Sequence, residues 1–218
     1  MLYKLSNKLD INANFFLNNV LWFFLSTFIF SRFFYIIAEW QDFKFVLGAG
    51  VIKFLLMSDY NFSLMGGVVG FMAVLFFQLR RFKLSPRKYI DAVVLSFFFA
   101  AAVGYVGAFF GGQIYGKPTD LFIGITYTNP LSTNPYTSPT LPLALFYSLA
   151  SFLLFSVLYV SKVFIKIEGL IGYVGIIVFS SILLIGEFFN GNTDFFRTYI
   201  ALDMTQIGSI ILITLAAR

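Results

Sequence analysis

Only a few residues of this 218-residue sequence could do chemistry, and the most informative stand at the ends of long apolar runs. Arg32 lies within the first run, toward its outer end, and Glu187 lies at the end of the fifth. An arginine at such depth costs about 2.5–3.5 kcal/mol to insert, so it usually faces a bundle interior or an aqueous cavity. We therefore interpret Arg32 as an anion-facing residue with Glu187 as its natural counter-charge. The alternative for Arg32 is snorkelling to the outer headgroups.

Two residue types are absent. The chain has no histidine, which removes the usual neutral-pH general base and the commonest metal ligand. It also has no cysteine, which excludes disulfide scaffolds and thiolate catalysis. We expect neither a metal nor a cofactor. Asp91 opens the third apolar run, where the helix macrodipole favours an acidic residue.

Glycines form three groups with different expected roles. The spacing of the first and third groups is typical of close packing between membrane helices: Gly66, Gly67 and Gly70, then Gly169, Gly172 and Gly175. The second group runs off an apolar stretch into a polar segment: Gly104, Gly107, Gly111, Gly112 and Gly116, with Gln113, Tyr115, Lys117, Pro118, Thr119 and Asp120. A glycine-dense backbone there could lie close to a phosphate or lipid headgroup. No Walker A or dinucleotide fingerprint occurs, so a nucleotide site is not indicated.

The elements that must position these residues are membrane helices. The sequence is 59% hydrophobic and 11% charged, far from the roughly 25% charged of ordinary soluble domains. A hydrocarbon core of about 30 Å needs about 20 apolar residues per helix. Six runs qualify or nearly do: 15–38, 63–78, 89–110, 141–160, 170–189 and the short 204–217. These runs predict an all-α, polytopic membrane bundle of about six helices in one integral domain, residues 1–218, with residues 1–14 as an interfacial segment.

Charge asymmetry predicts the orientation. Ten basic residues fall on one side of the predicted spans: Lys4, Lys8, Arg80, Arg81, Lys83, Arg87, Lys88, Lys162, Lys166 and Arg218. Four fall on the other: Lys44, Lys53, Lys117 and Arg197. The positive-inside rule then places both termini in the cytoplasm and leaves outer loops at about 40–62, 111–140 and 190–203. Because the positive charges sit at helix ends, we expect no nucleic-acid partner. The proline- and hydroxyl-rich stretch 128–142 predicts an irregular lid or partner surface.

The glycine-rich segment resembles the signature of the prolipoprotein diacylglyceryl transferase family. These bacterial enzymes move a diacylglyceryl group from phosphatidylglycerol to the lipobox cysteine of a preprolipoprotein. The family pattern is roughly G-R-I-G-N-F-I-N-G-E-L-Y-G-R-P-T-D, and residues 104–120 read G-Y-V-G-A-F-F-G-G-Q-I-Y-G-K-P-T-D. Further pieces follow in the family's order: Ser31-Arg32 with Tyr35, residues 62–67, Asp91, residues 141–147, Glu187-Phe-Phe and Met204-Thr-Gln206. The family is similar to a seven-helix bundle with an outside N-terminus; this chain would lack the first of those helices.

The resemblance implies the candidate site residues. The lipid headgroup would be bound by Arg32, Gly104, Gly107, Gly112, Tyr115, Gly116 and Gln206, and catalysis would fall to Gln113, Glu187 and Tyr105. Several polar positions of the family pattern are substituted. Met65 and Leu141 stand at its histidines, Tyr105 and Asn190 at arginines, Gln113 and Tyr147 at glutamates, and Ala108 and Gly111 at asparagines.

Three functional hypotheses follow. The first is a working transferase in the bacterial inner membrane, with Arg32 on the phosphate, Glu187 or Asp120 as base, and Gln113 and Tyr105 orienting the headgroup. The second is an inactive relative that binds phospholipid, or a subunit of another membrane complex, motivated by the lost ionisable residues. The expected partners are phosphatidylglycerol and either a lipoprotein precursor or another membrane protein. The third, a transporter or channel, is disfavoured by the scarcity of intramembrane charges.

Overall fold

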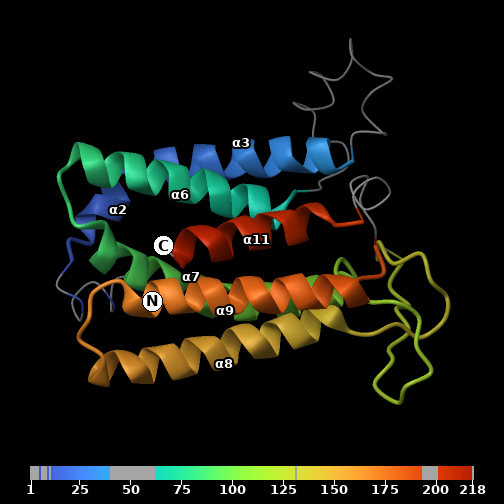
Figure 1. The fold of residues 1–218 in the computed structure, drawn as a ribbon. Helices are drawn as coiled ribbons and strands as arrows, with labels where there is room; N and C mark the ends of the chain where they lie inside the picture. The colour runs from blue at the N-terminus through green and yellow to red at the C-terminus, as the bar shows by residue number, and fades with distance from the viewer. Residues whose placement is uncertain are drawn as a thin grey trace, which may run out of the picture. The chain divides into compact units, whose positions relative to one another are not determined.

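Helices are the regular elements of the described chain (Figure 1). The computed structural model describes residues 5, 9, 11–39, 62–130, 132–192 and 201–217. Its elements are α2 (Asn14–Asn18), α3 (Val20–Ala38), α6 (Leu64–Arg81), α7 (Pro86–Phe110), α8 (Leu143–Phe164), α9 (Leu170–Gly186), the 3-10 helix η2 (Glu187–Phe189) and α11 (Met204–Ala216).

The protein is a multi-pass membrane protein. Five segments are long and apolar enough to cross a membrane: Val20–Ala38, Leu64–Arg81, Pro86–Phe110, Leu143–Phe164 and Leu170–Phe189. The apolar α11 is shorter, with 13 residues. The predicted all-α membrane bundle of about six helices is confirmed, whereas the cytoplasmic placement of both termini stays a prediction. Most of the interfacial segment 1–14, nearly all of the loop 40–62 and most of the loop 190–203 lie outside the described residues.

Contacts divide the chain into two compact units, which we describe separately. One comprises Met1–Ile11, Arg87–Thr193 and Ser209–Arg218, and the other comprises Asn12–Pro86 and Asp194–Gly208. We call them the α7–α9 unit and the α3–α6 unit. The prediction of a single integral domain remains untested.

In the α3–α6 unit, glycines let two helices run side by side (Figure 1). A methyl group at Gly70 would lie 2.5 Å from the Ser26 carbonyl oxygen, and one at Gly66 would collide with the Phe30 carbonyl oxygen. The Ser31 hydroxyl adds a 2.7 Å hydrogen bond to the Ser63 carbonyl oxygen, which fixes the start of α6 against α3. The predicted packing role of the first glycine group is confirmed.

In the α7–α9 unit, the third glycine group has the same role. Methyl groups at Gly172 and Gly175 would collide with side chains of α7, namely Ile90 and Val94. Helix α8 joins this packing through the Ser148 hydroxyl, which donates a 2.7 Å hydrogen bond to the Ala102 carbonyl oxygen of α7. The three longest apolar segments of this unit therefore contact one another directly.

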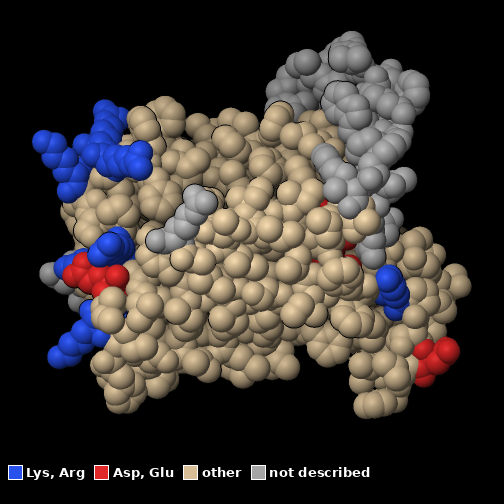
Figure 2. All heavy atoms as spheres, in the orientation of Figure 1, with Lys and Arg blue, Asp and Glu red and all other residues tan. Residues whose placement is uncertain are grey.

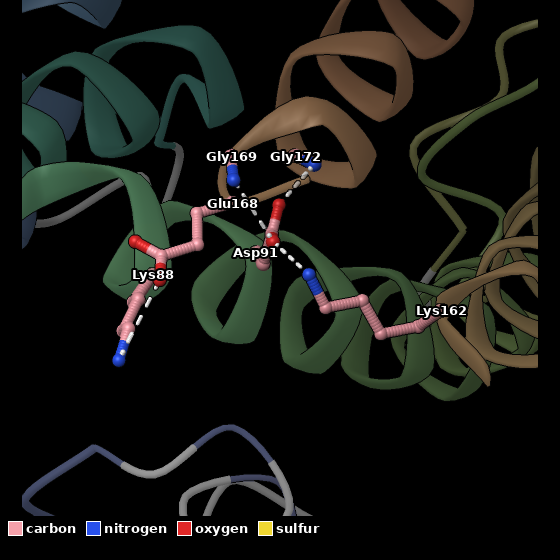
Figure 3. A network of polar contacts seen from close by, with 6 residues as sticks. All are labelled: Lys88, Asp91, Lys162, Glu168, Gly169 and Gly172. Carbon is pink, nitrogen blue, oxygen red and sulfur yellow. Dashed lines mark hydrogen bonds and ion pairs between the residues drawn. The ribbon is translucent and has the colours of Figure 1, made fainter. Parts of the chain in front are cut away.

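A buried carboxylate connects α7, α8 and α9 (Figure 3). It lies near the start of α7, whereas the loop 111–140 follows the end of that helix. Asp91, fully buried, accepts a 2.6 Å hydrogen bond from the Lys162 ammonium group and bonds from the backbone N–H groups of Gly169 and Gly172, at 3.0 and 2.7 Å. These N–H groups lie at the start of α9, whose cap residue Gly169 has no side chain to serve them. Asp91 thus caps α9, whereas the sequence placed it as an acid favoured by the dipole of its own helix.

The outer surface of this unit suits lipid. On α8, Leu149, Phe152, Leu153, Val157 and Val160 are each more than half exposed. In the space-filling view, the surface over α8 and α9 carries charged side chains only near the helix ends (Figure 2). A broad apolar, uncharged face of this kind is costly in water and favourable in a bilayer.

Candidate functional site

The signature segment 104–120 leaves α7 through a tight glycine turn. Helix α7 ends at Phe110, and Gly112 has a φ of +59°, a left-handed conformation that favours glycine. The Gly112 carbonyl oxygen accepts hydrogen bonds from the hydroxyls of Thr133 and Ser132, at 3.0 and 3.4 Å. A methyl group at Gly112 would collide with Ser132, so both the backbone conformation and the space require glycine here.

Beyond this turn, backbone hydrogen bonds join three segments that are far apart in the sequence. We call this arrangement, formed by residues 115–117, 139–141 and 187–191, the clasp. The Gly116 N–H donates to the Leu141 carbonyl oxygen at 2.7 Å, and the Lys117 N–H donates to the Phe189 carbonyl oxygen at 2.9 Å. The Gly191 N–H donates to the Tyr115 carbonyl oxygen at 3.1 Å. The clasp holds the loop end of α7 against the start of α8 and the end of α9.

Tyr115 is the aromatic centre of the clasp. Its ring is 6% exposed and packs edge-on against Tyr136, with 6.1 Å between the ring centroids. The Tyr136 hydroxyl in turn donates to the Gly191 carbonyl oxygen at 3.2 Å. Burial raises the pKa of the Tyr115 hydroxyl, and the neighbouring Tyr136 raises it further. Tyr115 is therefore a neutral, structural part of the signature segment.

Two signature glycines have a different environment. Gly104 and Gly107 lie on the same side of the last turns of α7 and are exposed. Within the described chain and apart from the adjacent backbone of α7 itself, no atom lies within 4 Å of where a side chain at either position would begin. Gln113, which follows the turn, is also exposed. These positions face outward from the unit and leave space beside the helix.

A cluster of polar side chains lies inside the same end of the unit. The rings of Tyr105 from α7 and Tyr147 from α8 pack with 5.3 Å between centroids, and both are buried. Glu187, 7% exposed, lies within electrostatic range of both hydroxyls. The Asn190 side-chain amide donates a 2.6 Å hydrogen bond to Glu187 Oε2. Two predicted catalytic residues, Tyr105 and Glu187, are thus brought together, and Tyr147 joins them.

Arg32 and Gln206 belong to the α3–α6 unit. Arg32 is fully buried, and its guanidinium carbon lies 5.4 Å from the Tyr35 ring centroid and 5.9 Å from that of Phe62, within cation–π range. This burial agrees with the interior interpretation rather than with snorkelling. Gln206 is 2% exposed and its Oε1 accepts a 3.0 Å hydrogen bond from the Asp203 N–H. The pairing of Arg32 with Glu187 across the two units remains a prediction.

Met65 stands at a histidine position of the family pattern and fills space. It is 4% exposed and packs against Gly208, where a methyl group would come within 2.5 Å of the Met65 Cγ atom. A thioether takes part in no proton transfer at neutral pH. The structure therefore gives this position a packing role.

Comparison with known proteins points to the same family as the signature residues 104–120. The sequence profile of the family described as prolipoprotein diacylglyceryl transferase matches residues 1–218. The chain belongs to this family. A phosphatidylglycerol–prolipoprotein diacylglyceryl transferase of Dehalococcoides mccartyi is 24% identical over 189 residues, covering 86% of this chain and 69% of that protein. One of Synechococcus elongatus is 28% identical over 118 residues, covering 54% of this chain and 39% of that protein.

A further relative of the same name, from Clostridium tetani, is 33% identical over 69 residues, which are 32% of this chain and 28% of that protein. Two of these three alignments span well under half of the relative's length. Membership of the prolipoprotein diacylglyceryl transferase family therefore rests on the whole-chain profile match and on the signature segment.

Tyr147 is the site residue that the sequence analysis missed. It stands at a glutamate position of the family pattern, and the sequence alone gives it no role. The signal that could have revealed it is pairing: Tyr105 and Tyr147 both replace charged residues of that pattern, and their rings pack together.

Proposed function

We propose that this protein binds phosphatidylglycerol in the bacterial inner membrane and transfers its diacylglyceryl group to the cysteine of a lipoprotein precursor. The observation that carries the proposal is the complete burial of Arg32 in an apolar helix. An arginine inside a membrane bundle usually lines the path of a substrate or ion. Its planar fork suits a phosphate, to which it can donate two parallel hydrogen bonds.

The reaction can be written with its atoms balanced. The cysteine sulfur attacks the glyceryl carbon that carries the phosphate, a sulfur–carbon bond forms, and the carbon–oxygen bond breaks. Glycerol phosphate leaves, and the thiol proton passes to a base. A thiol with a pKa near 8.5 is mostly protonated at neutral pH, so a base must assist. In this proposal Arg32 stabilises the charge on the departing phosphate, and the Glu187 carboxyl receives the proton.

The remaining candidate residues have supporting roles in this proposal. The space beside Gly104 and Gly107 would admit the lipid next to α7. Gly112, Tyr115 and Gly116 hold the signature segment through the turn and the clasp. Exposed Gln113 would orient the headgroup, and Tyr105 would do the same from its position beside Glu187. Gln206 would fix the start of α11 near Asp203.

The test is a transfer assay with detergent-purified protein, phosphatidylglycerol and a synthetic lipobox peptide. Mass spectrometry detects addition of a diacylglyceryl group to the peptide cysteine. We expect product with the natural chain and none with Arg32→Ala. Arg80→Ala, which removes an exposed arginine at the end of α6, is the matched control and should retain activity. Equal product from Arg32→Ala and the natural chain would refute the role of Arg32.

A second candidate function is phospholipid binding without transfer. It is favoured by the packing of Met65 against Gly208, because a histidine position of the family pattern holds a residue that cannot carry a proton. A relative from the same family that turns over in parallel is the positive control for the assay. Phosphatidylglycerol binding that depends on Arg32, without product, would establish this second function.

A further inference from the structure

The Tyr147 hydroxyl is a buried polar group without a hydrogen-bonding role in the described part of the chain. Tyr147 is 5% exposed, and its oxygen has no hydrogen-bond partner within the described part of the chain. Its ring lies against Gly186, where no side chain could fit, so the hydroxyl is held beside the residue that precedes Glu187. Buried hydroxyls in native proteins are nearly always paired, and an orphan one points to a missing partner.

The chemistry around this hydroxyl selects against an anion. The polar groups found there are the phenols of Tyr105 and Tyr147, the carboxyl group of Glu187 and the Asn190 amide. None of these four groups is a cation. A phosphate would face a carboxyl group without compensation, whereas an uncharged hydroxyl can accept from a phenol and donate to a carboxylate.

We propose that Tyr147 and Glu187 together bind the hydroxyl groups of an uncharged glycerol headgroup, with Tyr147 donating and Glu187 accepting. A diol has two hydroxyls on neighbouring carbons, which suits one donor and one acceptor set side by side. The inference rests on the proposed function for the identity of the lipid, and it makes Tyr147 a specificity-determining residue. Hydroxyl recognition is thereby assigned to this cluster, and phosphate recognition stays with the proposed function.

The paired replacement of charged residues supports this division. Where the family pattern has an arginine and a glutamate, this chain has Tyr105 and Tyr147, packed ring to ring. The exchange removes one positive and one negative charge from the same spot and leaves two neutral hydroxyl groups. A site changed in this way offers a phosphate no arginine to pair with and retains hydrogen-bonding capacity for a polyol.

The experiment compares two lipids that differ only in headgroup hydroxyls. Binding of dioctanoyl phosphatidylglycerol and dioctanoyl phosphatidylmethanol to the purified full chain is measured in detergent; both lipids carry one phosphodiester charge. We expect the natural chain to prefer phosphatidylglycerol about threefold to tenfold, as one or two net hydrogen bonds imply. Tyr147→Phe, which keeps the ring packing and the Glu187 acceptor, should lower that preference by about threefold, the share of one hydrogen bond, while leaving phosphatidylmethanol binding unchanged. Tyr173→Phe is the matched control. Tyr173 lies near the start of α9, whereas Tyr147 packs against Gly186 at its end, so this variant should keep the preference for phosphatidylglycerol.

The outcomes separate this inference from the proposed function. Equal binding of both lipids by the natural chain, or an unchanged preference in Tyr147→Phe, overturns hydroxyl recognition while phosphate binding at Arg32 stands. If the natural chain binds neither lipid, both the hydroxyl-recognition inference and the proposed function are overturned. Free glycerol at millimolar concentration tests whether the cluster binds a soluble polyol instead of a lipid. If free glycerol competes fully with phosphatidylglycerol, the assignment to a lipid headgroup is overturned. The ratio measured on the natural chain decides the question even if Tyr147→Phe does not fold.

Discussion

At the scale of single residues, Asp91 shows how one carboxylate can organise three membrane helices. It is fully buried and accepts hydrogen bonds from the Lys162 side chain and from two backbone N–H groups of α9 (Figure 3). The N-terminal N–H groups of a helix carry partial positive charge, so the carboxylate is stabilised by the α9 macrodipole as well as by the ammonium group. Its loss would leave both the ammonium group and the helix start without their acceptor.

We therefore predict that Asp91→Ala destabilises the protein by about 3–5 kcal/mol, the usual cost of breaking a buried ion pair on one side. Thermal unfolding in detergent, followed by circular dichroism, measures the change. The control is Glu168→Ala, which removes the partly exposed ion pair with Lys88, at 3.6 Å, and should cost less than about 1 kcal/mol. Similar losses of stability in the two variants would contradict the assignment of Asp91 as the cap of α9.

A second prediction at the scale of single residues concerns Gly112, where a side chain should destabilise the turn after α7. Its φ of +59° and its contact with Ser132 leave no room for a side chain. Gly112→Ala should cost about 1–2 kcal/mol from the left-handed backbone alone, and more from the collision. Because the turn anchors the loop 111–140, the expected result is faster proteolysis within that loop. Gly111→Ala is the control, since its nearest neighbour is the Gln113 side chain at 3.4 Å; equal cleavage rates in both variants would count against the turn.

At the scale of helices, glycines with similar spacing have opposite roles. Gly66 and Gly70 sit where α3 and α6 touch, whereas Gly104 and Gly107 on α7 meet no described atom. Both sets have the small-residue spacing that usually means helix packing in membranes. Only the structure separates a glycine that lets two backbones approach from one that leaves a helix face open.

The contrast predicts different consequences of adding one methyl group. Gly70→Ala should destabilise the protein by about 1–3 kcal/mol, because the new carbon would press on the backbone of α3. Gly107→Ala should leave stability unchanged or raise it by up to about 1 kcal/mol, since alanine favours helix. If lipid occupies the space beside α7, Gly107→Ala will weaken phosphatidylglycerol binding without loss of stability. Thermal unfolding and lipid titration on the same samples give both readouts, and full lipid binding by Gly107→Ala would exclude that location.

The positions of the long helices could be predicted from the sequence. Apolar runs near 20 residues located the long helices, because a bilayer imposes both length and composition. The capping of α9 by Asp91 and the meeting of Tyr105, Tyr147 and Glu187 could not be predicted, because they join residues far apart in the chain. Their positions depend on how α7, α8 and α9 rotate against one another, which apolar composition does not encode. Met65 shows the same limit, since its partner Gly208 lies on another helix.

At the scale of the whole molecule, orientation in the membrane is the main prediction that follows from charge. Ten of the basic residues counted above lie on one side and four on the other, which favours cytoplasmic termini. The natural chain contains no cysteine, so single cysteines can be introduced without removing any. Ser138→Cys in the loop 111–140 should react with a membrane-impermeant maleimide in intact spheroplasts. Ser85→Cys, between α6 and α7, should react only after lysis, and the reverse pattern would invert the topology.

The clasp has a consequence for how the protein is made. Its hydrogen bonds link the loop after α7 to the chain just before α8 and to the end of α9. A ribosome delivers these segments one after another, so the signature loop emerges well before the partners that hold it. Until α9 and the residues after it are made, the Lys117 N–H lacks its acceptor, Phe189, and the Tyr136 hydroxyl lacks its acceptor, Gly191. A nascent chain stopped before Phe189 should therefore carry inserted helices and an unformed clasp, so the signature segment reaches its final form only when the fifth span is complete.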